Sequence, residues 1–146
     1  MAAAPPPRSF HNSARYRVRV THTFNARHAL TFPGGTAEPS HGHDWTLTVE
    51  VGSDTLDAVD CVLDFHALEA ALAGLVEPWH HGDLNTLPPF WDAVAGELAL
   101  NPSAERVAEA VLEGLMPLVT AIRREARVLS VAVTEAPGCI AHVLAG

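Results

Sequence analysis

The stretch from Phe24 to Trp45 constrains the fold more than any other part of the chain, because it holds histidines at the spacing of metal ligands. His41 and His43 stand two residues apart, directly before an alternating run that ends at Val51. Side chains of a strand alternate between its faces, so a strand that begins at His41 would carry both imidazoles on one side. The sequence therefore predicts a strand that starts with a pair of metal ligands.

A third histidine, His28, follows an earlier alternating run over residues 16–24, which predicts a half-buried strand. The connection to His41 is rich in Gly and Pro and is typical of a loop that folds His28 back onto the pair. Three neutral imidazoles from two adjacent strands would form a zinc site with an open fourth position. A His-x-His pair alone is weak evidence, because such pairs also occur as ordinary polar side chains.

Two helices are predicted in the middle of the chain. The first begins after Asp64 as N-cap and ends at Pro78. The second has Asn101 as N-cap and runs to about Arg124, with Pro117 predicting a kink or a break. The segment Phe90–Leu100, which lies between them, is interpreted as an extra helical turn or a lid.

Two short strands, residues 128–134 and 139–144, complete the pattern and are joined by the turn signal Ala136-Pro137-Gly138, which predicts a hairpin. The order strand, strand, helix, helix, strand, strand lacks β-α-β alternation. It predicts an α+β fold with a four-stranded antiparallel sheet and two helices on one face. Such a sheet has two open edges.

Length and charge narrow the class of protein. The 146 residues suit one domain, expected over residues 15–146, with residues 1–14 as a disordered tail. A net charge of -8 argues against nucleic-acid binding. Neither a signal peptide nor a membrane-spanning run is indicated, and two cysteines are compatible with a reducing compartment, so we expect a cytoplasmic protein.

Several segments, spread in order over roughly residues 18–143, are similar to motifs of the 6-pyruvoyltetrahydropterin and 6-carboxytetrahydropterin synthase family. These segments are Phe24-x-Ala26-x-His28-x-Leu30, His41-Gly42-His43, Val62-Leu63-Asp64-Phe65, His81-Gly82-Asp83-Leu84-Asn85, Asn101-Pro102-Ser103-Ala104-Glu105 and Val131-Ala132-Val133-Thr134-Glu135. The resemblance implies the tunnelling fold, in which three subunits join their sheets into a β-barrel and two trimers stack, with active sites at subunit boundaries. It thus implies a homo-oligomer, either a trimer or a hexamer.

The resemblance also implies Zn2+ as cofactor and a pterin as substrate, namely 7,8-dihydroneopterin or its triphosphate. Glu135 would accept two hydrogen bonds from the amidine-like edge of the pterin, and Ser103 would contribute to substrate binding. A charged residue at the end of an apolar strand costs free energy unless it is paired. A helix cap or a salt bridge is the alternative explanation for Glu135.

The chain departs from the family at its catalytic cysteine. The positions six and four residues before His41 hold Gly35 and Ala37, so no thiol stands there. Glu38 stands three before His41, which is similar to a third type of member in which a glutamate takes over from the cysteine. That type cleaves the dihydroneopterin side chain to give 6-hydroxymethyl-7,8-dihydropterin. An ordinary loop glutamate is the alternative interpretation.

A second departure is His80, which stands where the family has an aspartate before its histidine, here His81. Imidazole can fix the tautomer of a neighbouring histidine but cannot stabilise its charged form, so His81 would be a weaker acid–base partner. The alternative interpretation of the segment Trp79-His80-His81 is a surface turn.

Three hypotheses follow. The first is a zinc-dependent pterin lyase with Glu38 and His81 as proton carriers, and side-chain cleavage is favoured over the synthase reactions that depend on the missing thiol. The second is a catalytically altered pterin-binding paralogue that keeps zinc, suggested by the departures at Ala37 and His80. The third is a small soluble metal-binding domain, which predicts zinc uptake without pterin affinity.

Overall fold

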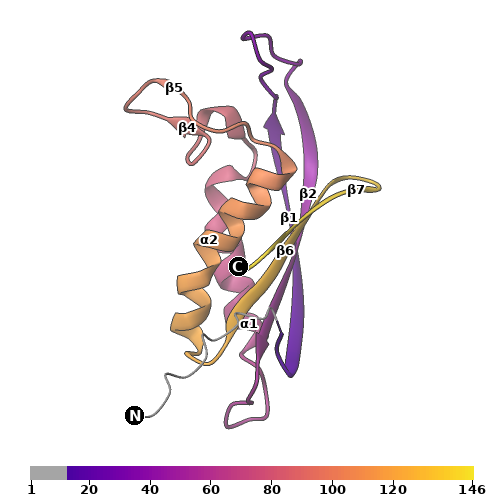
Figure 1. Cartoon of the computed structure of the whole chain (residues 1–146), viewed down its shortest axis with the longest axis vertical. Coiled ribbons are helices and arrows are strands. Elements are labelled where there is room, and N and C mark those ends of the chain that lie inside the picture. The colour runs from indigo at the N-terminus through magenta and orange to yellow at the C-terminus, as the bar shows by residue number, and fades with distance from the viewer. Residues whose placement is uncertain (1–12) are drawn as a thin grey trace, which may run out of the picture.

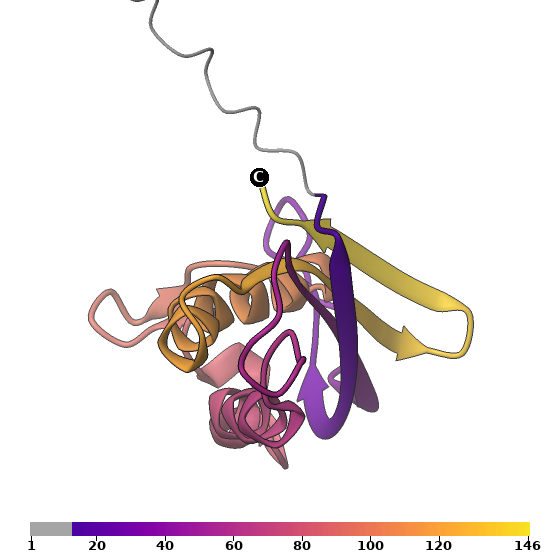
Figure 2. The ribbon, with the colours of Figure 1, turned by 90° about the horizontal axis from the view of Figure 1, so that it is seen from below.

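The computed structural model describes residues 13–146, so the tail expected over residues 1–14 lies outside the described residues except for its last two positions. A five-stranded sheet carries both long helices on one face, as Figures 1 and 2 show from two directions. The strand order is β3-β1-β2-β6-β7. The strands are β1 (Tyr16–His28), β2 (His41–Ser53), β3 (Gly82–Asp83), β6 (Arg127–Ala136) and β7 (Cys139–Leu144).

The four long strands are antiparallel, which confirms the predicted α+β class and sheet. β1 pairs with β2 in a register that sets His28 opposite His41 and Ala26 opposite His43. β2 pairs with β6, and β6 pairs with β7 through the predicted hairpin. The two-residue β3, which runs parallel to β1 beside Ala26 and Arg27, was not predicted.

The first helix, α1 (Phe65–Val76), begins as expected, because the Asp64 carboxylate accepts a hydrogen bond from the His66 N–H. A 3-10 turn, η1 (Glu77–Trp79), contains Pro78 and ends the helical segment. A second 3-10 turn, η2 (Leu84–Thr86), follows β3.

The second helix, α2 (Ala104–Ile122), corrects two predictions. Its N-cap is Ser103, whose hydroxyl accepts from the Arg106 N–H, and not Asn101, whose side chain binds another segment. The helix continues through Pro117, so of the predicted kink or break, the break is wrong. Pro117 and Glu113 are both exposed, so water can reach the Glu113 carbonyl that the proline leaves without a helical partner.

The core lies between the sheet and the helices. Phe24 and Trp45 stack with ring centroids 6.1 Å apart, and both side chains are almost fully buried. Buried leucines and valines of both helices pack on the same cluster; they are Leu68, Leu72, Val76, Val107, Val111, Leu115 and Val119. Burial of this apolar surface holds the strand ends that carry the histidines against the helices.

The segment Phe90–Leu100 forms a small hairpin of β4 (Trp91–Asp92) and β5 (Glu97–Leu98), so the extra helical turn is wrong. The Asp92 carboxylate accepts from two backbone N–H groups of the turn, and Gly96 adopts a φ of 68°. The hairpin projects from the body beside α2 (Figure 1). Within residues 13–146, neither helix is long and apolar enough to cross a membrane.

Candidate metal centre

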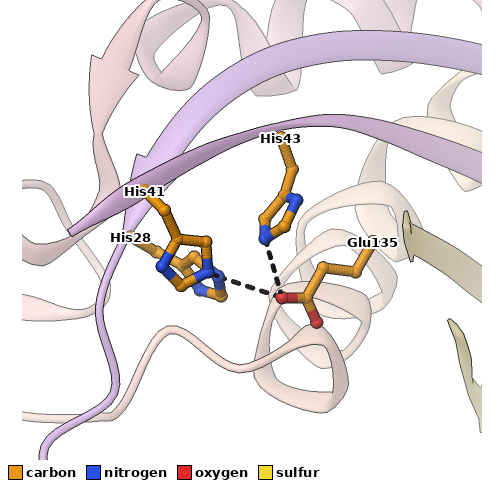
Figure 3. A group of neighbouring side chains, drawn as sticks. All are labelled: His28, His41, His43 and Glu135. Carbon is orange, nitrogen blue, oxygen red and sulfur yellow. Dashed lines mark hydrogen bonds and ion pairs between the residues drawn. The ribbon is translucent and has the colours of Figure 1, made fainter. Parts of the chain in front are cut away.

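The three predicted histidines converge at one end of the β1–β2 hairpin. His28 is the last residue of β1 and is 1% exposed, while His41 and His43 are the first and third residues of β2. Together with Glu135 of β6 they form a group whose ligand atoms all lie within 4.8 Å of one another. Figure 3 shows the three rings and the carboxylate pointing toward a common centre.

Backbone carbonyls orient two of the rings. His28 Nδ1 lies 2.7 Å from the Pro102 carbonyl oxygen, and His41 Nδ1 lies 2.9 Å from that of Pro39. A carbonyl can only accept, so Nδ1 carries the proton in each ring, and a neutral ring then has a lone pair on Nε2. Outer hydrogen bonds of this kind orient the histidine ligands of metal sites.

The inward-facing nitrogens fit a bound cation. His28 Nε2 lies 3.1 Å from His41 Nε2, so in the neutral rings two lone pairs face each other without a proton between them. Among the described residues, His43 Nε2 is the one buried side-chain polar atom without a hydrogen-bond partner. Buried polar groups without partners cost free energy, and a divalent cation at the centre would satisfy all three nitrogens.

The electrostatics of His43 favour the ligating form of its ring. Burial lowers the pKa of His43 below its ordinary value; the Glu135 carboxylate opposes this shift without reversing it. Nearby His28 and His41 lower the pKa further. A lowered pKa keeps the imidazole neutral near pH 7, and only the neutral ring can bind a metal.

Glu135 completes the group. Its Oε1 lies 3.0 Å from His28 Nε2 and 3.1 Å from His43 Nε2. The second separation is short, but His43 Nε2 has no hydrogen-bond partner, so these two atoms do not meet the geometry of a hydrogen bond. The contact therefore brings two possible metal-ligating atoms close to one centre without a hydrogen bond between them.

Glu38 lies in the loop beside this group. Its Oε1 accepts from the Leu30 N–H at 3.0 Å, and its own N–H donates to the Leu30 carbonyl at 3.0 Å. The charge of this carboxylate slightly opposes the lowering of the His43 pKa, although Glu38 is not one of the four converging groups.

His80 and His81 lie apart from this group in the chain. Their rings pack with centroids 3.8 Å apart, and both residues are exposed at the edge of β1. His80 Nδ1 accepts from the Asn25 N–H, and the His81 N–H donates to the Asn25 carbonyl. The structure thus brings together His28, His41, His43 and Glu135 but not the His80–His81 pair. Ser103, as helix cap, directly follows the proline whose carbonyl holds His28.

Two asparagines hold the chain just after His28: Asn85, which had no predicted role, and Asn101, which was predicted as a helix N-cap. The Asn85 side chain accepts from the Ala29 N–H and donates to the Ala29 carbonyl, both at 2.8 Å. Asn101 makes the same pair of bonds to Thr31, at 2.8 and 2.9 Å. The two amides continue the hydrogen-bonding edge of β1. Both stood in the motif segments, but a motif does not reveal partners 56 and 70 residues away.

Replacing Asn85 with alanine is expected to lower the free energy of unfolding by about 1–3 kcal/mol, because the partly buried Ala29 N–H and carbonyl both lose their partner. Denaturant titration followed by tryptophan fluorescence measures the change. Asn101→Ala is the matched control, since its bonds are exposed and water can replace them, so we expect a smaller loss. An unchanged denaturation midpoint of Asn85→Ala would contradict the stabilising role of these hydrogen bonds.

Comparisons with known proteins agree with this geometry. A family model described as 6-pyruvoyl tetrahydropterin synthase matches residues 17–145. A 6-carboxy-5,6,7,8-tetrahydropterin synthase of Aquifex aeolicus (strain VF5) is 36% identical over 77 residues, which are 51% of this chain and 48% of that protein. The match therefore spans about half the length of that curated relative.

Solved structures share the fold. A 6-pyruvoyltetrahydropterin synthase of Plasmodium vivax, described as a catalytic residue mutant with alanine in place of a glutamate, superposes with a TM-score of 0.70 at 17% identity. That match covers 88% of this chain and 96% of the other. The Caenorhabditis elegans 6-pyruvoyl tetrahydropterin synthase gives a TM-score of 0.69 at 17% identity, over 90% and 96% of the two chains. At such identities the likeness concerns the fold alone.

Proposed function

Because this chain belongs to the 6-pyruvoyl tetrahydropterin synthase family, we propose that it is a zinc-dependent lyase acting on 7,8-dihydroneopterin or its triphosphate. The observation that carries the proposal is the convergence of three imidazole nitrogens, each able to offer a lone pair, on one centre beside Glu135. We favour cleavage of the substrate side chain toward 6-hydroxymethyl-7,8-dihydropterin over the synthase reactions.

In this proposal His28, His41 and His43 hold the metal, and Glu135 anchors the pterin. A bound divalent cation would polarise a side-chain oxygen of the substrate and so make its proton more acidic. A pocket of about 450 Å³, lined in part by His43, Glu135 and Pro137, lies beside the group and offers room for a substrate. Ser103 stays a proposed substrate contact, next to the segment that holds His28.

The favoured reaction needs one base and one acid. We propose that Glu38 removes the proton from the hydroxyl on the second side-chain carbon. The bond between the first and second side-chain carbons then breaks, with its electron pair left on the first. A proton returned to that carbon gives the hydroxymethyl product, and a two-carbon aldehyde leaves.

Three observations support Glu38 as the base. It lies in the loop beside the three histidines, and its charge acts on His43. Both cysteines, Cys61 and Cys139, are exposed, and neither belongs to the converging group. Solved structures of the Plasmodium vivax protein are described as catalytic residue mutants in which alanine or cysteine replaces a glutamate. We propose the corresponding role for Glu38.

His81, assisted by His80, is the proposed second proton carrier, and we propose that it serves the site of a neighbouring subunit. This pair lies at the outer edge of β1, which β3 covers only beside Ala26 and Arg27. β7 forms the other edge of the sheet. Edges of this kind can pair with another chain, which supports a homo-oligomer with a shared barrel, either a trimer or a hexamer.

The helix-free face of the sheet has the polar character that the inside of a wide barrel needs. Glu50 is only 8% exposed, and its carboxylate oxygens lie 3.0 Å from a guanidinium nitrogen of Arg17 and 2.8 Å from one of Arg19. Burial alone would raise the pKa of Glu50, but its bonds to Arg19 and Arg17 outweigh burial and lower the pKa. An ionised carboxylate with two guanidiniums suits a water-lined interior better than an apolar interface.

The second candidate is a catalytically altered paralogue that binds zinc and pterin without lyase turnover. One observation favours it: within residues 13–146, neither His80 nor His81 forms an ion pair with a carboxylate. A histidine without such a partner is a weaker acid–base catalyst near pH 7.

Product analysis tests the proposal. Incubating the zinc-loaded full chain with 7,8-dihydroneopterin, and separately with its triphosphate, is expected to yield 6-hydroxymethyl-7,8-dihydropterin by mass spectrometry. Pterin binding without a product would favour the altered paralogue. Zinc uptake without pterin binding would contradict both and leave the simple metal-binding domain.

A further inference from the structure

The Glu135 carboxylate stands where a fourth metal ligand would be. Its Oε1 lies 3.0 and 3.1 Å from two of the histidine nitrogens, and the nitrogens of His28 and His41 are 3.1 Å apart. Neighbouring donor atoms around a tetrahedral zinc with bonds near 2.0 Å are about 3.3 Å apart. Three of the six separations among the four donor atoms are thus close to this spacing, and all six lie within 4.8 Å.

This position conflicts with the proposed role of Glu135 in binding the pterin. A carboxylate that accepts two hydrogen bonds from a pterin uses both oxygens, and the substrate also needs an open position among the ligands. In the arrangement seen, one oxygen faces the histidines and fills that position. The two tasks cannot be performed at the same time.

We propose that Glu135 is an exchangeable fourth ligand, which closes the metal site in the substrate-free protein and releases it when a pterin takes the carboxylate. This inference rests on the proposed function. The exchange couples recognition of the pterin ring to the opening of the reactive position, so the site opens when the correct ring is bound.

The backbone at Glu135 supports a movable carboxylate. The β6–β7 register shifts between Thr134 and Ala136, which leaves Glu135 outside the regular pairing of the two strands. Such bulges re-aim a side chain and often occur beside active sites. The Glu135 side chain is 27% exposed and borders the pocket that also contacts His43, so it has space to turn toward a ligand there.

The affinity for Co2+ shows whether Glu135 binds the metal in the substrate-free protein, and its measurement requires no turnover. In chelator competition at pH 7.5, Glu135→Gln is expected to weaken Co2+ binding by about ten- to a hundredfold, since one ligand is lost. Asp44→Asn is the matched control: it removes an equal charge from the residue after His43, on an exposed side chain bonded to Asn25. We expect less than about a twofold change there. Equal Co2+ affinities of wild type and Glu135→Gln would overturn the ligand role.

Azide binding to the cobalt protein, followed by visible absorption, tests the exchange. Wild type should bind azide at least about tenfold more weakly than Glu135→Gln, because Glu135 occupies the fourth position. Unsubstituted pterin, which lacks the side chain, should strengthen azide binding to wild type toward the Glu135→Gln value.

Two outcomes would overturn the exchange, and they separate it from the proposed function. If pterin binds, as seen by its fluorescence, and azide affinity stays unchanged, the exchange is wrong while the lyase proposal stands on its product assay. If pterin does not bind at all, the proposed function and the exchange both fail. A normal Tm of Glu135→Gln excludes misfolding as the cause of either result.

Discussion

Replacing His41 with alanine is expected to remove zinc from the protein, lowering its metal affinity by at least about a hundredfold and abolishing any lyase activity. His41 supplies one of three nitrogens that face a common centre, and its Nε2 lies 3.1 Å from that of His28. Two imidazoles would remain beside Glu135, and the loss of one of three nitrogen ligands is expected to weaken zinc binding strongly. Elemental analysis after dialysis measures the loss.

The same substitution should spare the metal-free fold. His41 is only partly buried, and its replacement removes one of two nitrogen lone pairs that face each other in the metal-free protein. Metal-free His41→Ala is therefore expected to be at least as stable as metal-free wild type. Zinc should raise the Tm of wild type, because ligands that bind only the folded state stabilise it, and should leave that of the variant unchanged.

His66→Ala is the matched control for the metal measurement. His66 lies on α1, its side chain is 94% exposed, and it forms a 3.8 Å ion pair with Glu69 on the same helix. Its removal should alter neither zinc content nor Tm beyond error. Full zinc occupancy in His41→Ala would refute the three-imidazole site.

Replacing Glu38 with glutamine is expected to lower turnover by about 10²- to 10⁴-fold, the usual contribution of a general base. Glutamine keeps an oxygen that can accept the Leu30 N–H, so the loop should hold its conformation. Zinc content should stay at the wild-type level because Glu38 is not among the four converging groups. Steady-state product formation and elemental analysis give the two readouts.

Glu105→Gln provides the control for this variant. Glu105 lies exposed in the first turn of α2, so its replacement removes the same charge outside the loop that holds Glu38. Its turnover should match wild type. Intact turnover in Glu38→Gln would show that another group takes the proton, whereas loss of zinc would show that Glu38 acts through the metal site.

Local backbone geometry made much of the site predictable. Alternation over two residues determines which side chains share a strand face, so His41 and His43 could be placed together from their spacing alone. The strand before them and the Gly/Pro-rich loop predicted a hairpin, and its register does bring His28 opposite His41. The Asp64 cap was predicted because capping depends on neighbouring residues.

Contacts between distant segments could not be predicted in this way. The second helix begins at Ser103 because Asn101 is used by Thr31, 70 residues earlier in the chain. Likewise, the Asn85 side chain binds Ala29, which lies 56 residues earlier in the chain. The sequence also gave no sign that Phe90–Leu100 would form a hairpin, since its two strands are only two residues long.

The sequence by itself determined the four long strands and which imidazoles share a face, because these follow from the period of a single extended chain. Only the tertiary structure decided that Glu135 meets those imidazoles and that His80 and His81 do not. The physical reason is that both outcomes depend on how β6 and β3 pack beside the hairpin, and on a register shift at Thr134 that no local pattern encodes.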